Sequence, residues 1–487
     1  MELASAPVTR RRAWAAVAVV CAALFLLGLD FTVLNVAVPG LRAELGPTLA
    51  ETQWIVDGYA LALGGCVLAA GALGDRHGRR RAFAAGLALC ALASVAGATG
   101  DGPARLVAAR CAMGLGAALF MPATLSTIVH VLPGRADRRR AIGVWAAVAG
   151  VGALFGPVAG GWLVERYGWQ AAFWLNVPVA AAILAAVPVL PESRDPDPRR
   201  LDHPGALLSC GGLLALVWGV IEAPGRGWTS AGVLAAFGAA ALLLTGFTLW
   251  QLRCAAPMVP VRLLRGGPVW PATLCLALMS FAMFGAMFLL TLYLQQVRGL
   301  SAWAAGQRMV PLSLGLAAGA VLGPVVARRL GARVPVAGGL LLIVAGFAQL
   351  GRLTAGSGDA PVLLFEGVCG FGAGLLAPVA TELVMSAVPA AMAGVGSALN
   401  DATRQVGSTL GVAVLGSVLA TVAAGAPVAG AAAFTDGLAA ASRVGAGVAL
   451  LAAVLAWYRL PGRRPAQAPV PVPELDRASP PPSLLGR

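Results

Sequence analysis

Long apolar runs recur along the whole chain, and they restrict it to folds that can exist inside a lipid bilayer. An apolar run of about 20 residues crosses the roughly 30 Å hydrocarbon layer as an α-helix, and no water is present there to hydrogen-bond an open backbone. Charged residues make up only 11% of the chain, less than half of the roughly 25% that is usual in soluble proteins. We therefore expect an all-α polytopic membrane protein.

The apolar runs are numerous enough for fourteen transmembrane helices, which we read as two six-helix bundles plus two inserted central helices. The predicted spans are 14–37, 53–73, 82–99, 104–127, 139–163, 171–190, 206–222, 231–252, 270–296, 303–327, 334–353, 361–385, 396–422 and 437–458.

Two polar segments divide these spans into domains. Segment 191–204 is the longest polar break between spans, and 253–268 is a second basic connection. The predicted domains are a cytoplasmic N-terminus at 1–13, an N-terminal six-helix bundle at 14–190, a cytoplasmic linker with two inserted transmembrane helices at 191–269, a C-terminal six-helix bundle at 270–460 and a disordered cytoplasmic tail at 461–487. Two such repeats would place a binding site at their interface.

The positions of the arginines predict the orientation in the membrane. The net charge is +14, and all 35 residues of the Lys and Arg class are arginine. Most of them lie in short connections on one side of the predicted spans, which the positive-inside rule assigns to the cytoplasm. Both termini are therefore expected in the cytoplasm, and the basic charge requires no nucleic-acid partner. Exclusive use of arginine with abundant Ala and Gly favours a GC-rich bacterial genome, and hence the bacterial cytoplasmic membrane.

A charged turn, GALGDRHGRRR at Gly71–Arg81, separates the second and third predicted spans. Its glycines let the backbone bend sharply, while Asp75 can cap a helix or pair with an arginine. An ordinary positively charged loop is the alternative interpretation, but the turn is more patterned than charge bias alone requires.

Three ionisable residues lie within predicted spans at similar depth. The helix rise places Asp30 about 24 Å from Trp14 at the inner end of its span. Asp57 and Arg110 lie about 6 Å and about 9 Å from the outer ends of theirs. Such a residue near a helix centre costs roughly 2.5–3.5 kcal/mol on insertion scales, so it should face the bundle interior with a partner or water.

These residues have a functional and a structural interpretation. A carboxylate in a cavity that opens alternately to the two sides of the membrane can gain and lose a proton, which would couple proton entry to cargo exit. Alternatively, Asp30 and Arg110 form a purely structural lock, and Asp57 is simply hydrated near the interface.

Further polar residues inside the spans are candidates for lining a cavity. They are Asn35, Glu366, Asp401 and Arg404. The i,i+3 spacing of Asp401 and Arg404 slightly favours a helix-local salt bridge over a cavity role.

The fifth predicted span contains the glycine-rich sequence GALFGPVAGG. Gly152, Gly156 and Gly160 recur on one face of a helix, which lets another helix pack at close range. Pro157 frees a backbone carbonyl and kinks the span. On spacing alone, ordinary packing of small residues explains this sequence.

Residue types that catalysis would need do not gather in the spans. Without lysine the chain has neither a GxxxxGK[ST] phosphate-binding loop nor a Schiff-base mechanism. The three histidines and eight cysteines show no metal-ligand spacing. We therefore expect no enzyme activity, no metal and no cofactor, and a proton gradient as the energy source.

Four sequence motifs together resemble those of the major facilitator superfamily, and within it the fourteen-helix drug:proton antiporters. They are LDFTVLNVAVP in the first span, GALGDRHGRRR after the second, LVAARCAMGLGAA in the fourth and GALFGPVAGG in the fifth. The resemblance implies the major facilitator fold and assigns proton coupling to Asp30 and Arg110, to which we add Asp57. The implied cytoplasmic gate comprises Gly71, Asp75, Arg76, Gly78 and Arg79, and the implied antiporter helix kink comprises Gly152, Gly156, Pro157 and Gly160.

The resemblance implies proton-coupled efflux of hydrophobic or amphiphilic drugs or antibiotics, by rocking of two bundles about a central cavity. The expected partners are a small molecule, protons and the bilayer, and the expected state is a monomer. Two alternatives stay open, namely a carrier of the same superfamily for another small solute and a membrane sensor that transports nothing. The few polar residues inside the spans argue against a sugar-like solute, because sugar sites need many hydrogen-bonding groups.

Overall fold

The computed structural model describes residues 9–132, 134–194, 202–254, 257, 267, 269–387, 393–425 and 430–462. Within these ranges the regular elements are all helices, as the long apolar runs predict. Most of the predicted N-terminal segment 1–13 and nearly all of the predicted tail 461–487 lie outside the described residues.

The first half of the chain forms the helices that carry most of the predicted site. They are α1 (Arg10–Leu45), α2 (Leu49–His77), α3 (Arg79–Ala98), α4 (Pro103–Val131), α5 (Arg135–Tyr167), α6 (Ala171–Trp174), α7 (Asn176–Ala186) and the 3-10 helix η1 (Val187–Val189). Local chemistry sets the boundary between α1 and α2. Gly46 ends α1 in the left-handed region at φ 63°, and Thr48 and Glu51 begin α2 by capping each other's backbone N–H groups.

The second half begins with the inserted pair α8 (His203–Arg226) and α9 (Ala231–Arg253). The helices that follow are α11 (Val269–Leu292), the π-helical turn η2 (Tyr293–Val297), α12 (Ala302–Arg308), α13 (Val310–Leu330), α14 (Arg333–Leu350), α15 (Asp359–Ala387), α16 (Ala393–Ala424) and α17 (Ala431–Arg459).

Two predicted spans are interrupted near a proline. Span 171–190 is divided into α6, α7 and η1, and span 303–327 is divided into α12 and α13. Pro178 and Pro311 follow the two breaks. Because proline has no backbone N–H, the carbonyl four residues before each one loses its helical hydrogen bond.

Fewer than fourteen helices in the described part of the chain meet the length and hydropathy expected of a membrane span. In the described residues, twelve helices are long and apolar enough to cross a membrane, or thirteen if the two parts of α2, bent by 55° between Val67 and Ala69, count as one span. Each of the fourteen predicted ranges coincides with helical elements. The helix α5 is the one that is not among the thirteen candidate spans of the described residues. The count of fourteen is therefore not confirmed.

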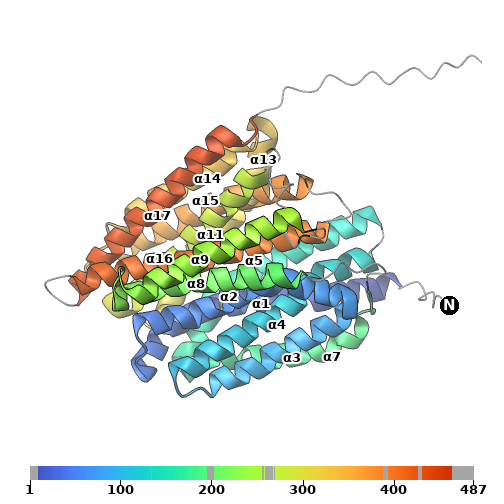
Figure 1. The fold of residues 1–487 in the computed structure, drawn as a ribbon, viewed down its shortest axis with the longest axis horizontal. Coiled ribbons are helices and arrows are strands. Elements are labelled where there is room, and N and C mark those ends of the chain that lie inside the picture. Colours follow the sequence, from blue (N-terminus) through green and yellow to red (C-terminus); the bar gives the residue numbers. More distant parts are fainter. Residues whose placement is uncertain are drawn as a thin grey trace, which may run out of the picture.

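Two large clusters of buried apolar side chains form the core. One runs from Ala13 to Leu190, and the other consists of Val38 together with residues between Ala272 and Leu460. In Figure 1 the helices of the first half, in blue to cyan, lie beside those of the second half, in yellow to red. Polar side chains on α1, α2, α11 and α16 therefore lie where the two halves of the chain meet.

The inserted helix α8 lies over the seam between the two halves. It packs against α9, and it also contacts both α2 and α16, as its position in Figure 1 illustrates. Val217, Val220 and Ile221 of α8 form a small buried cluster with Ala413 of α16. Ser417 of α16 donates a hydrogen bond of 2.7 Å to the carbonyl of Val220. The inserted pair is thus attached to the seam on one side of the molecule.

Candidate functional site

The predicted residues Asp30 and Arg110 meet in the interior of the first half. The Nη1 atom of Arg110 on α4 lies 2.9 Å from Oδ2 of Asp30 on α1. Only 4% of Asp30 and 2% of Arg110 is exposed. A buried charge needs such a partner, because breaking a buried ion pair leaves an uncompensated charge in a poorly solvated place.

Three neighbours that we had not predicted hold this ion pair in place. Asn176 on α7 donates from Nδ2 to Oδ1 of Asp30 at 2.6 Å. Arg110 donates from Nε to the carbonyl of Ile55 at 3.3 Å, and its guanidinium lies 4.3 Å from the centre of the Tyr59 ring. The pair therefore touches α1, α2, α4 and α7. The isolated polar Asn176 inside an apolar run was the sequence signal that could have identified it.

A cavity between the two halves borders the other side of Arg110. Its lining residues are Phe31, Leu34, Asn35, Val56, Asp57, Ala60, Arg110, Phe284, Ser408 and Val412, which come from α1, α2, α4, α11 and α16. We call it the central cavity. The structure thus brings Asn35, Asp57 and Arg110 to the lining of one cavity, which Asp30 itself does not line.

Asp57 is the acidic residue of the central cavity. It is 1% exposed, and its Oδ2 atom has no hydrogen-bond partner among the described residues. Asn35, by contrast, donates from Nδ2 to the carbonyl of Phe31 at 3.3 Å. An acceptor that is buried and unpaired is available for a proton, a cargo group or a re-oriented Arg110.

The predicted gate residues form a compact turn at the other end of α2. Arg79 pairs with Asp75 at 2.7 Å, and Gly78 between α2 and α3 has φ 113°, a conformation that favours glycine. Arg76 is exposed. Gly71 faces Pro122 of α4, where an added Cβ would lie 3.4 Å away.

The segment after η1 anchors this turn, which the sequence had not indicated. Glu192 accepts a hydrogen bond of 3.2 Å from the backbone N–H of Arg80, and its carboxylate lies 3.7 Å from the Arg80 side chain. The backbone N–H of Arg79 donates to the carbonyl of Ser193 at 3.0 Å. The turn is therefore connected to the end of the first half of the chain.

The glycines of α5 pack against α1. A Cβ atom added to Gly152, Gly156 or Gly160 would meet Phe25, Thr32 or Val33 of α1 respectively. On its other side, the carbonyl of Pro157 lies where a Cβ of Gly306 on α12 would be. The helix with the proline thus lies between α1 and the second half of the chain.

Three predicted cavity residues are not brought to the central cavity. Glu366 on α15 is buried at 1% exposure, with Oε2 unpartnered within the described part of the chain. Asp401 is half-buried and Arg404 exposed on α16, and no ion pair joins them in the described residues. None of the three lines the cavity that contains Asp57.

A family model with the description Major Facilitator Superfamily matches residues 20–412. The chain belongs to this superfamily.

Relatives within the Major Facilitator Superfamily include two named for resistance or export. The chain is 37% identical over 418 residues to the tetracenomycin C resistance and export protein of Streptomyces glaucescens, covering 85% of this chain and 77% of the relative. It is 36% identical over 401 residues to the multidrug resistance protein Stp of Mycobacterium tuberculosis, covering 82% of this chain and 74% of the relative.

A solved structure supports the fold independently. A peptide transporter in complex with sulfate superposes with a TM-score of 0.67 at 17% identity, covering 94% of this chain and 95% of the transporter. This likeness supports the major facilitator fold alone.

In this superfamily member, several hydrogen bonds between the two halves lie near the C-terminal ends of α1 and α5. Gln295 of η2 donates to the carbonyl of Val36 at 3.0 Å, and Arg42 of α1 donates to Gln296 at 3.2 Å. The backbone N–H of Trp303 on α12 donates to Glu165 of α5 at 3.0 Å. These contacts hold the two halves together at one end of the molecule.

Proposed function

We propose that this protein exports hydrophobic or amphiphilic compounds by alternating access, with protons moving in the opposite direction. The observation that supports it most directly is the buried Asp30–Arg110 pair at 2.9 Å, next to a cavity between the two halves that contains Asp57. The direction of transport is supported by relatives named for resistance and export.

The geometry offers a route from proton binding to movement. A proton on Asp30 would remove the negative charge that compensates Arg110, and an unpaired buried cation is costly. Asp57 is the acidic side chain that lines the central cavity together with Arg110, and its Oδ2 atom is unpartnered in the described chain. Protonation of Asp30 would therefore shift Arg110 from α1 toward α2, so that a proton changes the contacts between helices.

The membrane arrangement is part of the same proposal. The chain has fourteen spans, two six-helix bundles at 14–190 and 270–460, and an inserted pair between them. Both termini are in the cytoplasm because arginine-rich connections stay on that side of a membrane. Helical elements at all fourteen predicted ranges support the count. The protein acts as a monomer in the bacterial cytoplasmic membrane, with the proton gradient as its energy source.

The direct test is transport into inverted membrane vesicles with an imposed proton gradient, acid inside. Two compounds would be supplied outside the vesicles. They are ethidium, a fluorescent lipophilic cation, and tetracenomycin C, after which one of the relatives is named. Wild-type vesicles should accumulate at least one compound and lose part of the gradient in doing so. Asp30→Asn should abolish both signals, because this change removes the carboxylate that pairs with Arg110.

The matched control is Asp101→Asn, which makes the same chemical change at an exposed position just before α4. Its transport should equal that of the wild type. Folded wild-type protein that moves no compound in a broad panel would overturn the efflux proposal and favour a sensor. Transport that persists unchanged in Asp30→Asn would overturn the coupling assignment instead.

A further inference from the structure

The connection between α11 and α13 supplies contacts from the second half of the chain to the first. It consists of residues 293–308, which include η2 and α12, and we call it the gate segment. Its Gln295 and Gln296 side chains bond α1, and the backbone N–H of Trp303 bonds Glu165 of α5. These three hydrogen bonds between the halves therefore depend on where one short segment lies.

The helix α12 of the gate segment fits closely against α5. A Cβ atom added to Gly161 of α5 would lie 2.6 Å from the carbonyl oxygen of Ala302. A Cβ atom added to Gly306 would in turn meet the carbonyl of Pro157. Glycine at both positions lets the two backbones touch, which leaves no room for water between them there. The gate segment therefore closes this part of the boundary between the halves.

A small buried apolar cluster lies next to the gate segment and joins the two halves. Its members are Val36 of α1 and, from the second half, Met287 and Met309, with Ala302 of the gate segment packed against them. Val36 is fully buried. Its neighbour in the sequence, Asn35, lines the central cavity. Water or cargo that passed the gate segment at this point would therefore reach Val36 on the way to the central cavity.

A single carboxylate, that of Asp359 at the start of α15, binds the gate segment at two places. Its Oδ2 atom lies 2.6 Å from Nη2 of Arg308 at the end of α12, and its Oδ1 atom lies 2.8 Å from Nη1 of Arg298 just after η2. Oδ1 also accepts a hydrogen bond of 2.9 Å from Nε of Arg308. The Tyr293 hydroxyl of η2 donates to the carbonyl of Thr354 at 2.6 Å. The gate segment is thus fixed to the second half around the start of α15.

Irregular backbone bounds the gate segment. The segment begins with the π-helical turn η2, and Met309 separates α12 from α13. Between η2 and α12, Gly299 has φ 64°. Such places can absorb changes in backbone angles, so the segment can move without unfolding α11 or α13.

We propose that the gate segment closes the central cavity toward the outside of the cell, and that Asp359 is the positioning residue that holds it closed. This inference deepens the proposed function and rests on it, because the proposed membrane arrangement places the C-terminal ends of α1 and α5 outside. The Asp359 side chain is 41% exposed, so each of its ion pairs is individually weak. Loss of its charge should therefore shift the balance between closed and open conformations and leave the helices folded.

The test measures how fast a membrane-impermeant, positively charged methanethiosulfonate reagent, added outside intact cells, modifies the thiol introduced by Val36→Cys. Labelling of the same protein without this substitution is subtracted, because the chain has eight native cysteines. A further change of Asp359→Asn should speed the modification about 3- to 10-fold, whereas Asp359→Glu keeps the charge and should stay within about twofold. Glu165→Gln weakens the hydrogen bond from Trp303 and should also speed it.

The matched control is Asp436→Asn, the same chemical change at an exposed acid of α17. The proposed arrangement places Asp436 on the same side of the membrane. This variant should be modified at the rate of the Val36→Cys protein that carries no second change. Size-exclusion profiles of the labelled proteins confirm that each variant is folded.

Several outcomes would overturn the outer gate. Equal rates in Asp359→Asn and Asp436→Asn would remove the role of Asp359, and an equal gain in Asp359→Glu would show that the charge does not hold the segment. If Asp359→Asn does not fold, an unchanged rate in Glu165→Gln decides against the gate. Faster modification only from the cytoplasmic side, in inverted vesicles, would place this end of the molecule inside the cell. The proposed function fails separately: the labelling pattern would persist, but vesicles would export no compound.

Discussion

Arg110 and Asp57 line the same buried cavity, but the Arg110 guanidinium is bonded at 2.9 Å to Asp30, and Asp57 keeps an unpartnered carboxylate oxygen within the described chain. Arg110 thus pairs with one buried acid and shares a cavity with a second, Asp57. An arrangement with two possible partners can respond to a single proton, and the predictions below test its parts.

Replacing Arg110 by lysine should reduce efflux by at least tenfold, although the charge is kept. The guanidinium bonds Asp30 and the Ile55 carbonyl simultaneously and stacks on Tyr59, whereas an ammonium group cannot reproduce this fork or the stacking. Initial rates in vesicles, normalised to the amount of protein, measure the effect. Arg105→Lys, on the exposed first turn of α4, is the control; a wild-type rate in Arg110→Lys would contradict the role of guanidinium geometry.

Breaking the buried pair from one side should destabilise the protein more than removing both charges. Arg110→Gln leaves the buried Asp30 carboxylate without a positively charged partner. Breaking a buried ion pair in this way typically lowers the free energy of unfolding by about 3–5 kcal/mol. The double variant Asp30→Asn with Arg110→Gln should recover a large part of the loss. Thermal unfolding in detergent, followed by a thiol-independent dye, gives the order of stability. Additive losses in the double variant would show that the two charges do not interact.

Asn176→Leu should lower both stability and proton-driven transport. The side chain is fully buried and donates to Asp30 at 2.6 Å, and a hydrogen bond to a charged group contributes about 1.5–3 kcal/mol. Urea or thermal unfolding and vesicle transport measure the two effects. Asn176→Asp should be worse, because it places a second carboxylate against Asp30. If Asn176→Leu has wild-type stability and transport, Asn176 does not hold the ion pair.

Gly156→Ala should reduce the yield of folded protein and its stability by roughly 1–3 kcal/mol, because the new methyl group would overlap the Thr32 hydroxyl on α1. Gly238→Ala on α9 is the matched control, since nothing lies within 4 Å of the position that its Cβ would take. Size-exclusion profiles and thermal unfolding distinguish them. Equal behaviour of both variants would mean that α1 and α5 tolerate a wider separation.

Glu192→Ala should slow transport several-fold with a stability loss of at most about 1 kcal/mol, because its salt bridges are partly exposed. The carboxylate anchors the backbone of Arg80, so its loss should free the turn between α2 and α3. Glu222→Ala removes a comparable exposed pair with Arg226 at the end of α8 and serves as the control. If both variants transport equally, the anchor has no part in the transport cycle.

The amino-acid sequence alone determined where the helices lie and which polar residues would be buried in them. A bilayer requires about 20 apolar residues for each span, so hydropathy along the sequence indicates where the helices lie. A charged side chain inside such a run is costly, so Asp30, Asp57 and Arg110 could be identified as buried polar residues that need a partner or a function. The same reasoning could not place the bend in α2 or the breaks near Pro178 and Pro311, because these depend on packing as well as composition.

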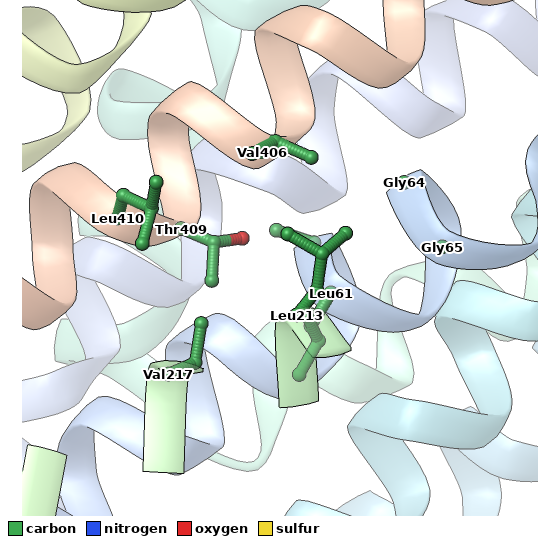
Figure 2. A pocket seen from close by; sticks show the side chains of 9 residues that line it. Leu61, Gly64, Gly65, Leu213, Val217, Val406, Thr409 and Leu410 are labelled. Atoms are coloured by element: carbon green, nitrogen blue, oxygen red, sulfur yellow. The ribbon is translucent and has the colours of Figure 1, made fainter. Parts of the chain in front are cut away.

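Only the tertiary structure decided which of these residues are partners. Asn176 reaches Asp30 across 146 positions of sequence, and Glu192 reaches the backbone of Arg80 across 112. The small apolar pocket in Figure 2 likewise exists only because α2, α8 and α16 meet. Hydropathy depends on the transfer of each residue from water to lipid, one residue at a time. These contacts depend instead on how helices that are far apart in sequence pack against each other, which a local sequence pattern does not specify.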